Sequence, residues 1–363
     1  MKVAIVCDWL VGIGGAERVI LELHKLYPDA PIYTSQYDPK SIDWFKDADV
    51  RTLWLQRLPK GLRKFLPPLR AWAFSHLDLS YYEVVISAGG AESKAVKTGP
   101  GTLHIGYINS PTHYYWSRYE QYLKNPGFGW LDPLARLGLK ILVGPLRRWD
   151  YKAAQRPDCL IAISSHIKNM IKEYYHRDSD VILPPVEVER FAGKSDEHRR
   201  GFVTAGRQTP YKRFDLAVLA CTQLNLPLLV LGSGPDNNKL RKMAGKNVTF
   251  LSGKSDEEFV HYFKTSLAFI FPGLDDFGIV AVEALAAGTP VIAYGAGGAK
   301  DYVNPGRNGL LFGEQTVESL VKALGTFSSS KFDHQNIQNS AQKFSSKNFR
   351  SNFEQFVDSH LKK

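Results

Sequence analysis

Cysteine, long apolar runs and low-complexity segments are scarce in this chain of 363 residues, and each absence narrows the class of protein. Cys7, Cys159 and Cys221 lie far apart, so the sequence has neither a disulfide framework nor the ligand spacing of a zinc site. No apolar run approaches the roughly 18–20 residues of a membrane span, and the run at 1–7 is too short for a signal-peptide core. We therefore expect a cytoplasmic protein, soluble or peripheral on the inner face of the cytoplasmic membrane.

The composition favours two globular domains and at least one anionic partner. Hydrophobic residues make up 44% of the chain, which is ample material for two cores. The formal net charge is +10, so the partner could be nucleic acid, an anionic lipid or an anionic substrate. A nucleic-acid-binding protein is supported only by this charge, because no recognition motif accompanies it.

The first half alternates apolar strands with amphipathic helices. Strands are predicted at 2–7, 84–87, 103–108 and 159–163, with helices at 16–25 and 164–175. Ser164 and Ser165 are N-cap candidates for the second helix. Gly12, Gly14 and Gly15 follow the first strand but do not match the dinucleotide fingerprint G-x-G-x-x-G. Pro184-Pro185 ends this half, and the polar run at 192–200 is predicted to be a linker.

The second half restarts the same alternation, with strands near 202–205, 227–231, 248–251, 268–271 and 291–293. We therefore predict an α/β protein of two doubly wound, Rossmann-like domains facing a central cleft. The first domain is expected at 1–185 and the second at 186–339. A helical tail at about 340–363 is expected to pack back on the first domain.

The stretch Phe271–Pro290 reads as a strand, a turn and the start of a helix. Asp275 and Glu283 flank the turn, and the helix start at 277–280 would attract an anion through its free N–H groups and dipole. The competing interpretation is that Asp275 or Asp276 is an N-cap and Glu283 a solvated helix residue.

Two cations and further glycine turns follow other strands of the second half. Arg207 and Lys212 lie five residues apart around a proline turn, where a guanidinium and an ammonium would suit a diphosphate. The alternative for these two cations is a surface salt bridge with Asp215. Glycine turns also occur at 231–236 (LGSGPD) and 295–299 (GAGGA).

These motifs together resemble the retaining glycosyltransferases of family 4, which have the GT-B fold. DDFGIVAVEALAAGTPVIA resembles the family's nucleotide-sugar signature, with Asp275 and Glu283 at its two acidic positions, and Arg207 and Lys212 match G-R-x-x-x-x-K. Asp275 departs from the family's glutamate by one methylene. The resemblance implies a donor site formed by Gly14, Gly15, Gly206, Arg207, Lys212, Gly232, Gly234, Asp275, Phe277, Gly278, Ile279, Val280 and Glu283.

The first half resembles the same family less closely. GGAER at 14–18 matches its first glycine loop, and YINSPTHYYW at 107–116 resembles a segment that normally carries a histidine where Asn109 stands. An amide cannot titrate near neutrality, so an acid–base role does not transfer to Asn109. His113 could compensate, or it could be an ordinary half-exposed loop histidine. The implied catalytic set is Arg207, Lys212, Asp275, Asn109 and His113.

The resemblance implies transfer of a hexose, best matched by mannose from GDP-mannose, to a glycan or lipid-linked glycan with retention of configuration. No cofactor or catalytic metal is expected, since the cations would neutralise the departing diphosphate. Alternatives are a UDP-sugar donor and a nucleotide-sugar 2-epimerase, which would need no acceptor.

Two segments have the composition of membrane-surface elements. Residues 51–70 contain six Lys/Arg and no Asp/Glu among leucines, Trp54 and Phe65. Residues 131–149 place Leu131, Leu134, Leu142 and Trp149 on one side of a helix that Gly144-Pro145 is expected to bend or end. Contact with an anionic membrane is one interpretation. A solvated basic face with core-facing apolar residues is the other.

Overall fold

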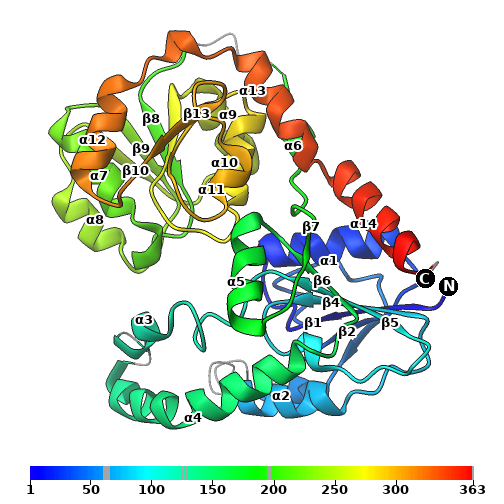
Figure 1. Ribbon diagram of the computed structural model, residues 1–363. Coiled ribbons are helices and arrows are strands. Elements are labelled where there is room, and N and C mark those ends of the chain that lie inside the picture. The colour runs from blue at the N-terminus through cyan, green and yellow to red at the C-terminus, as the bar shows by residue number, and fades with distance from the viewer. Residues whose placement is uncertain (60–65, 125, 128, 194–197, 362–363) are drawn as a thin grey trace. The chain divides into compact units, whose positions relative to one another are not determined.

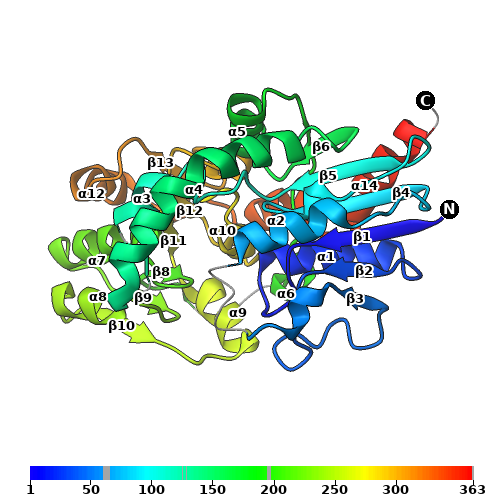
Figure 2. The same ribbon diagram turned by 90° about the horizontal axis from the view of Figure 1, so that it is seen from below.

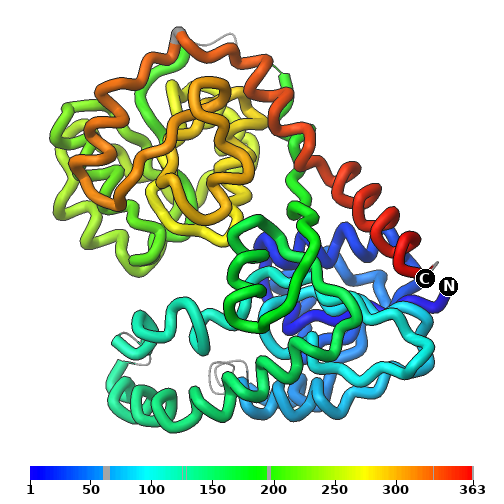
Figure 3. The backbone as a smooth tube through the Cα atoms, in the orientation of Figure 1, coloured from blue at the N-terminus to red at the C-terminus, as the bar shows by residue number. Residues whose placement is uncertain are grey.

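The computed structural model describes residues 1–59, 66–124, 126–127, 129–193 and 198–361, which form two compact units. Unit 1 comprises Met1–Pro184 and Phe349–Lys363, and unit 2 comprises Pro185–Asn348. Each unit is a parallel sheet flanked by helices (Figure 1), so the predicted class of two doubly wound domains is confirmed. Figure 3 follows the chain from unit 1 (blue to green) into unit 2 (green to orange) and back into unit 1 (red).

The seven-stranded sheet of unit 1 has the order β3-β2-β1-β4-β5-β6-β7. Its strands are β1 (Val3–Cys7), β2 (Ile32–Thr34), β3 (Val50–Thr52), β4 (Val84–Gly89), β5 (Leu103–Ile108), β6 (Cys159–Ala162) and β7 (Asp180–Val181). Every residue of β1 is buried, as expected for a parallel strand covered on both faces. Ile5 pairs with Ile32 on one side and Ile86 on the other.

Helices cover both faces of this sheet. The helices of unit 1 are α1 (Gly15–Leu26), α2 (Pro67–His76), α3 (Tyr119–Lys124), α4 (Asp132–Ala153), α5 (Ser165–Tyr175) and α14 (Ser346–Leu361), with 3-10 turns η1 (Trp54–Arg57), η3 (Ser93–Ala95) and η4 (Gly129–Leu131). On one face, Phe349 of α14 meets the ring of Tyr107 edge-on at 5.9 Å. On the other, Phe74 of α2 and Ala153 of α4 pack with Val6. The C-terminal helix therefore packs on the first domain, as predicted.

The six-stranded sheet of unit 2 has the order β10-β9-β8-β11-β12-β13. Its strands are β8 (Phe202–Ala205), β9 (Leu228–Leu231), β10 (Val248–Leu251), β11 (Ala268–Phe271), β12 (Val291–Tyr294) and β13 (Gly309–Phe312). Its helices are α6 (Val188–Phe191), α7 (Phe214–Gln223), α8 (Asn237–Met243), α9 (Asp256–Thr265), α10 (Ile279–Ala286), α11 (Ala299–Tyr302), α12 (Val317–Thr326) and α13 (His334–Ala341), with 3-10 turns η5 (Pro210–Lys212), η6 (Ser329–Lys331) and η7 (Gln342–Phe344).

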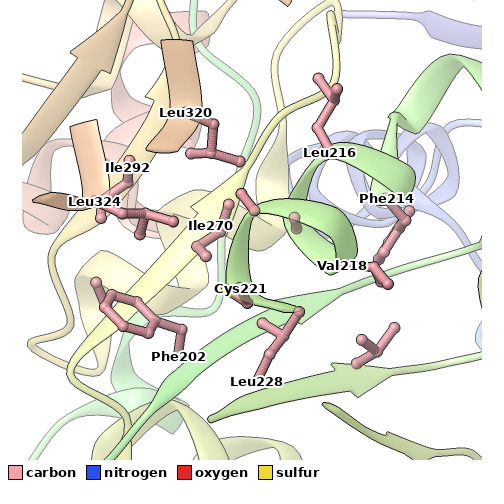
Figure 4. Packing of buried hydrophobic residues seen from close by; sticks show 14 of the residues in the cluster. Phe202, Phe214, Leu216, Val218, Cys221, Leu228, Ile270, Ile292, Leu320 and Leu324 are labelled. Atoms are coloured by element: carbon pink, nitrogen blue, oxygen red, sulfur yellow. The ribbon is translucent and has the colours of Figure 1, made fainter. Parts of the chain in front are cut away.

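The core of unit 2 lies between this sheet and the helices α7 and α12. Figure 4 shows Val218 of α7, Ile270 of β11 and Leu320 of α12 among the side chains of this one cluster. All three side chains are fully buried. This packing holds the strands in position, and the strand ends determine where each of the following loops begins.

Four strands were not predicted, namely β2, β3, β7 and β13. β2, β3 and β7 have only two or three residues, and such short strands carry little periodic signal. Ser164 is the N-cap of α5, as predicted, and its Oγ accepts the N–H of Ile167 at 3.1 Å.

Gly144-Pro145 was expected to bend or end the helix, and of these alternatives the end is wrong, because α4 continues through Pro145 to Ala153. Pro145 removes the hydrogen bond to the carbonyl of Ile141. The exposed position of Ile141 lets water replace that bond. No helix in the described part of the chain is long and apolar enough to cross a membrane.

The predicted linker at 192–200 is anchored at its end. Arg199 donates to the carbonyls of Phe263 (3.3 Å), Ser266 (3.0 Å) and Ala287 (3.1 Å), which lie at the ends of α9 and α10. Residues 194–197 lie outside the described part. The chain returns to unit 1 after Asn348 rather than near 340, because α13 packs against α10 within unit 2.

The basic stretch 51–70 is less available than its composition suggested. Arg70 is buried and pairs with Glu92 at 3.0 Å, and Arg51 pairs with Asp49 at 2.7 Å. Leu55 and Leu66 are core residues. The predicted contacts at Lys60, Leu62, Arg63, Lys64 and Phe65 lie outside the described residues.

Candidate nucleotide-sugar site

The second-half motifs gather at the carboxyl edge of the six-stranded sheet. The strand order reverses direction between β8 and β11, and ligands of open α/β sheets bind outside such a switch point. Lys212 follows β8, and Asp275 follows β11. The two segments therefore flank the point where this fold offers a binding site.

Lys212 and Asp275 form an ion pair across the switch point. The Lys212 ammonium contacts Oδ2 of Asp275, and their side chains are only 18% and 11% exposed. Asp215 instead pairs with Arg213 at 3.0 Å, so the alternative pairing of Lys212 with Asp215 is wrong. Arg207 is exposed at the same edge. An ammonium already held by a carboxylate can exchange that partner for a phosphate group.

The start of α10 excludes the simpler interpretation of its acidic residues. Its N-cap residue is Gly278, with φ +101°, so neither Asp275 nor Asp276 occupies the N-cap position. Glu283 is buried at 9% exposure rather than solvated. The first-turn N–H groups of this helix form a positive end. A Cβ at Gly278 would lie 2.7 Å from the Tyr302 hydroxyl, so only glycine fits.

The glycine turns approach neighbouring backbone closely. A Cβ at Gly232 would lie 2.4 Å from the carbonyl oxygen of Gly206, and one at Gly234 would lie 2.4 Å from that of Gln208. Gly298 donates its N–H to the carbonyl of Asp275 at 3.0 Å. The loops after β8, β9, β11 and β12 therefore form one connected surface.

Gln208 is a residue of this surface that sequence reasoning missed. It is fully buried, donates to the carbonyl of Gly232 at 2.9 Å and accepts from the Asn237 side chain at 2.7 Å. These bonds tie the Arg207–Lys212 segment to the LGSGPD turn. Its position between two predicted site residues in the sequence was the available signal.

Unit 1 contains a pocket of about 290 Å³ whose lining residues all belong to that unit. Asn109 and His113 both line it, and His113 lies 2.9 Å from the Ser117 hydroxyl through Nδ1. Gly14 is the N-cap of α1, which begins at Gly15, and Glu17 of that helix reaches the pocket wall. Burial raises the pKa of Glu17 above its ordinary value.

Asp8 lines this pocket, and it was not among the residues predicted for the site. Its carboxylate accepts four backbone N–H groups, from Gly90 (3.2 Å), Ala91 (3.1 Å), Glu92 (2.8 Å) and Ser93 (2.7 Å). A carboxylate directly after a buried first strand was the signal. The bonds fix the loop after β4.

A buried network supports the segment that carries His113. Asp150 of α4 accepts from Lys94 (2.7 Å), Thr112 (3.2 Å), Trp116 (2.7 Å) and Tyr175 (2.8 Å). Burial and the Asp150 carboxylate raise the pKa of Tyr175, so its hydroxyl stays a donor. The network therefore holds both ends of residues 112–116.

The predicted catalytic residues thus fall into two groups. Asn109 and His113 belong to unit 1, and Arg207, Lys212 and Asp275 belong to unit 2. Among the described residues, no group of three or more His, Cys, Asp or Glu side chains is placed to hold a metal ion. The unit 1 cavity and the unit 2 loops each provide polar groups suited to sugar hydroxyls or phosphates.

Comparison with solved structures defines the fold class as GT-B. Sucrose-phosphate synthase from Thermosynechococcus elongatus superimposes with a TM-score of 0.72 at 18% identity, covering 99% of each chain. Anabaena HepE in complex with UDP and glucose gives a TM-score of 0.72 at 18% identity, covering 99% of this chain and 100% of that one.

Residues 185–344, nearly all of unit 2, match the family model of glycosyl transferases group 1. An uncharacterized glycosyltransferase of Methanocaldococcus jannaschii is 28% identical over 49% of this chain and 52% of its own length. A GDP-mannose-dependent alpha-(1-6)-phosphatidylinositol monomannoside mannosyltransferase of Mycolicibacterium smegmatis is 30% identical over 39% and 45%, respectively. The chain spans about half the length of the curated relatives it matches.

Proposed function

We propose that this protein is a retaining glycosyltransferase of family 4 that transfers a hexose from a nucleotide diphosphate donor to a glycan or lipid-linked glycan. The observation that carries the proposal is the Lys212–Asp275 ion pair between the strand ends of β8 and β11, beside the start of α10. The match of residues 185–344 to glycosyl transferases group 1 supports the same assignment.

The proposed donor is GDP-mannose, with a UDP-sugar as the alternative. The mannosyltransferase relative from Mycolicibacterium smegmatis favours GDP-mannose, and HepE, solved with UDP and glucose, favours UDP. Gly206, Gly232 and Gly234 would let backbone approach the diphosphate, and Glu283 would bind ribose or sugar hydroxyls at the α10 start. Gly14 and Gly15 would contribute from the unit 1 loop.

The proposed reaction proceeds on one face of the sugar without a metal. The bond from the anomeric carbon to the diphosphate breaks while the acceptor oxygen forms its bond on the same side, and the acceptor proton passes to a diphosphate oxygen. Arg207 and Lys212 would stabilise the charge on the departing diphosphate, with Asp275 turning to the sugar. Asn109 or His113 would hydrogen-bond sugar hydroxyls. Activity is expected to persist in excess chelator.

A ligand screen tests the donor. A bound donor stabilises the folded state by mass action, so GDP-mannose should raise the melting temperature more than UDP- or ADP-sugars do. Absence of any nucleotide effect would overturn the proposal. A product assay then separates transfer, which makes a new glycoside, from epimerisation, which releases an epimerised or free sugar without an acceptor.

Glu283→Gln tests the site itself. It should weaken nucleotide binding by calorimetry while the melting temperature of the ligand-free protein changes little, because the amide fills the same space. Unchanged nucleotide affinity would remove Glu283 from the site. A lipid-linked acceptor would be met at the inner face of the cytoplasmic membrane, where the segments 51–70 and 131–149 were expected to make contact.

A further inference from the structure

Helix α4 and the turn before it expose a row of large apolar side chains. Trp130, Leu134, Leu137 and Ile141 are 87%, 67%, 55% and 63% exposed, and their spacing of three to four residues places them on one side of the helix. Only Asp150 and Ala153 of α4 are buried. The row, called here the α4 stripe, is therefore not a core face. Of the side chains predicted to share one side of this helix, Leu134 and Leu142 are exposed, whereas Trp149 packs against the core.

A second exposed apolar group lies at η1 and α2. Trp54, Leu69 and Trp72 are 45%, 43% and 56% exposed, and the two indole rings meet edge-on at 6.4 Å. Tryptophan is the side chain enriched at membrane interfaces, because it presents an apolar body with one N–H donor.

The two groups belong to helices on the same face of unit 1. Figures 1 and 2 both place α2 and α4 on the side of the sheet away from α1 and α14. The Trp149 indole donates to the Ser75 hydroxyl at 3.1 Å, which joins the end of α4 to α2. Phe74 and Ala153 share one core cluster beneath them. We call this the α2–α4 face.

The charge of the α2–α4 face selects its partner. Residues 51–76 contain no Asp or Glu, and residues 129–149 contain only Asp132. Arg57, Lys140 and Arg148 are exposed there. A face of this sign would repel a second copy of itself and attract an anionic surface. An apolar row flanked by cations is the pattern of a helix that lies in the plane of a membrane interface.

We propose that the α2–α4 face docks on anionic phospholipid, with α4 parallel to the surface and the α4 stripe among the headgroups and upper acyl chains. Trp54, Trp72 and Trp130 lie at headgroup level. The docking goes beyond the proposed sugar transfer and does not depend on it, because every residue involved lies in unit 1 outside the pocket of that unit.

Vesicle cosedimentation tests the apolar part. The parent protein at low salt should bind vesicles of phosphatidylcholine and phosphatidylglycerol in equal parts, and should bind vesicles of phosphatidylcholine alone far more weakly. Leu134→Gln/Leu137→Gln/Ile141→Gln should weaken binding roughly a hundredfold, since the lost apolar area no longer enters the lipid. The matched control Ile13→Gln/Leu361→Gln, at two exposed apolar positions off this face, should bind like the parent.

The cationic part has its own variant. Arg57→Gln/Lys140→Gln/Arg148→Gln should weaken binding to the anionic vesicles by about a hundredfold, and added salt should weaken the parent in the same direction. Far-ultraviolet circular dichroism should be unchanged in all variants. A parent that does not bind the anionic vesicles, or a stripe variant that binds as the parent does, would overturn the proposal. So would sedimentation showing a parent dimer that the stripe variant abolishes.

Discussion

Replacing Asp150 with asparagine should strongly destabilise unit 1, although the two side chains have nearly the same shape. Asp150 is fully buried and its partner Lys94 is 2% exposed, so the change leaves an ammonium without its counter-charge away from water. Breaking a buried ion pair in this way costs about 3–5 kcal/mol. The new NH₂ group would also face hydrogen-bond donors in either orientation of the amide. One orientation points it at Lys94 and Thr112, and the other at Trp116 and Tyr175.

The expected shift can be stated for a melting experiment. Unit 1 consists of 184 residues before unit 2 and 15 residues after it. For a domain of that size, the melting temperature falls by about 2–4 °C for each kcal/mol of stability lost. Asp150→Asn should therefore lower the unit 1 transition by about 6–20 °C, measured by circular dichroism and urea unfolding, while the unit 2 transition stays in place.

A double-mutant cycle gives the control. Lys94→Met/Asp150→Leu removes both charges and should cost less than the sum of the two single changes, because neither charge is then left alone. Asp43→Asn, at an exposed pair with Lys46 of the same unit, should leave the unit 1 transition unchanged. If Asp150→Asn melts with the parent, the pair is not the anchor that the geometry indicates.

Three further changes test other parts of the chain. Lys212→Ala should lower turnover more than about tenfold through loss of charge stabilisation, while Lys246→Ala, at an exposed lysine of the same unit, should be neutral in the same assay. Burial lowers the pKa of His104 to about 3, so below pH 6.5 the unfolded chain binds a proton that the folded chain does not. The free energy of unfolding should therefore fall by about 1.4 kcal/mol per pH unit toward pH 3. In urea titrations, His104→Gln should lack this pH-dependent component. Gly278→Ala should destabilise unit 2 by about 1–3 kcal/mol in urea and weaken nucleotide binding, whereas Gly325→Ala in α12, where a Cβ meets nothing within 4 Å, should not.

The elements of unit 2 were predictable because their signals are local. Buried runs such as β8 and β11 are bounded by glycine and proline, and the residues after them carry the site motifs. Asp275 and Glu283 could be singled out in the same way. The direct pairing of Lys212 with Asp275 could not, since 63 residues separate them and only the sheet order brings them together.

Sequence reasoning failed where tertiary burial decides a residue's state. Arg70 counted as a surface cation, yet Glu92 draws it into the core of unit 1. Pro145 looked like a helix end, yet the exposed surface of α4 tolerates the missing hydrogen bond. The apolar residues of α4 gave no local sign that the end of the helix packs through Trp149 and Ala153 while Leu137 and Ile141 stay exposed.

The return of α14 to unit 1 determines the order in which the domains can be completed during synthesis. Phe349, Phe353 and Val357 of α14 are buried parts of unit 1, but they follow the 164 residues of Pro185–Asn348. At translation rates of about 5–20 residues per second, the ribosome needs about 8–33 s to make that insert. During this interval the emerging first domain keeps the apolar surface around Tyr107 uncovered, so the second domain can finish folding first and the final helix acts as the closing step.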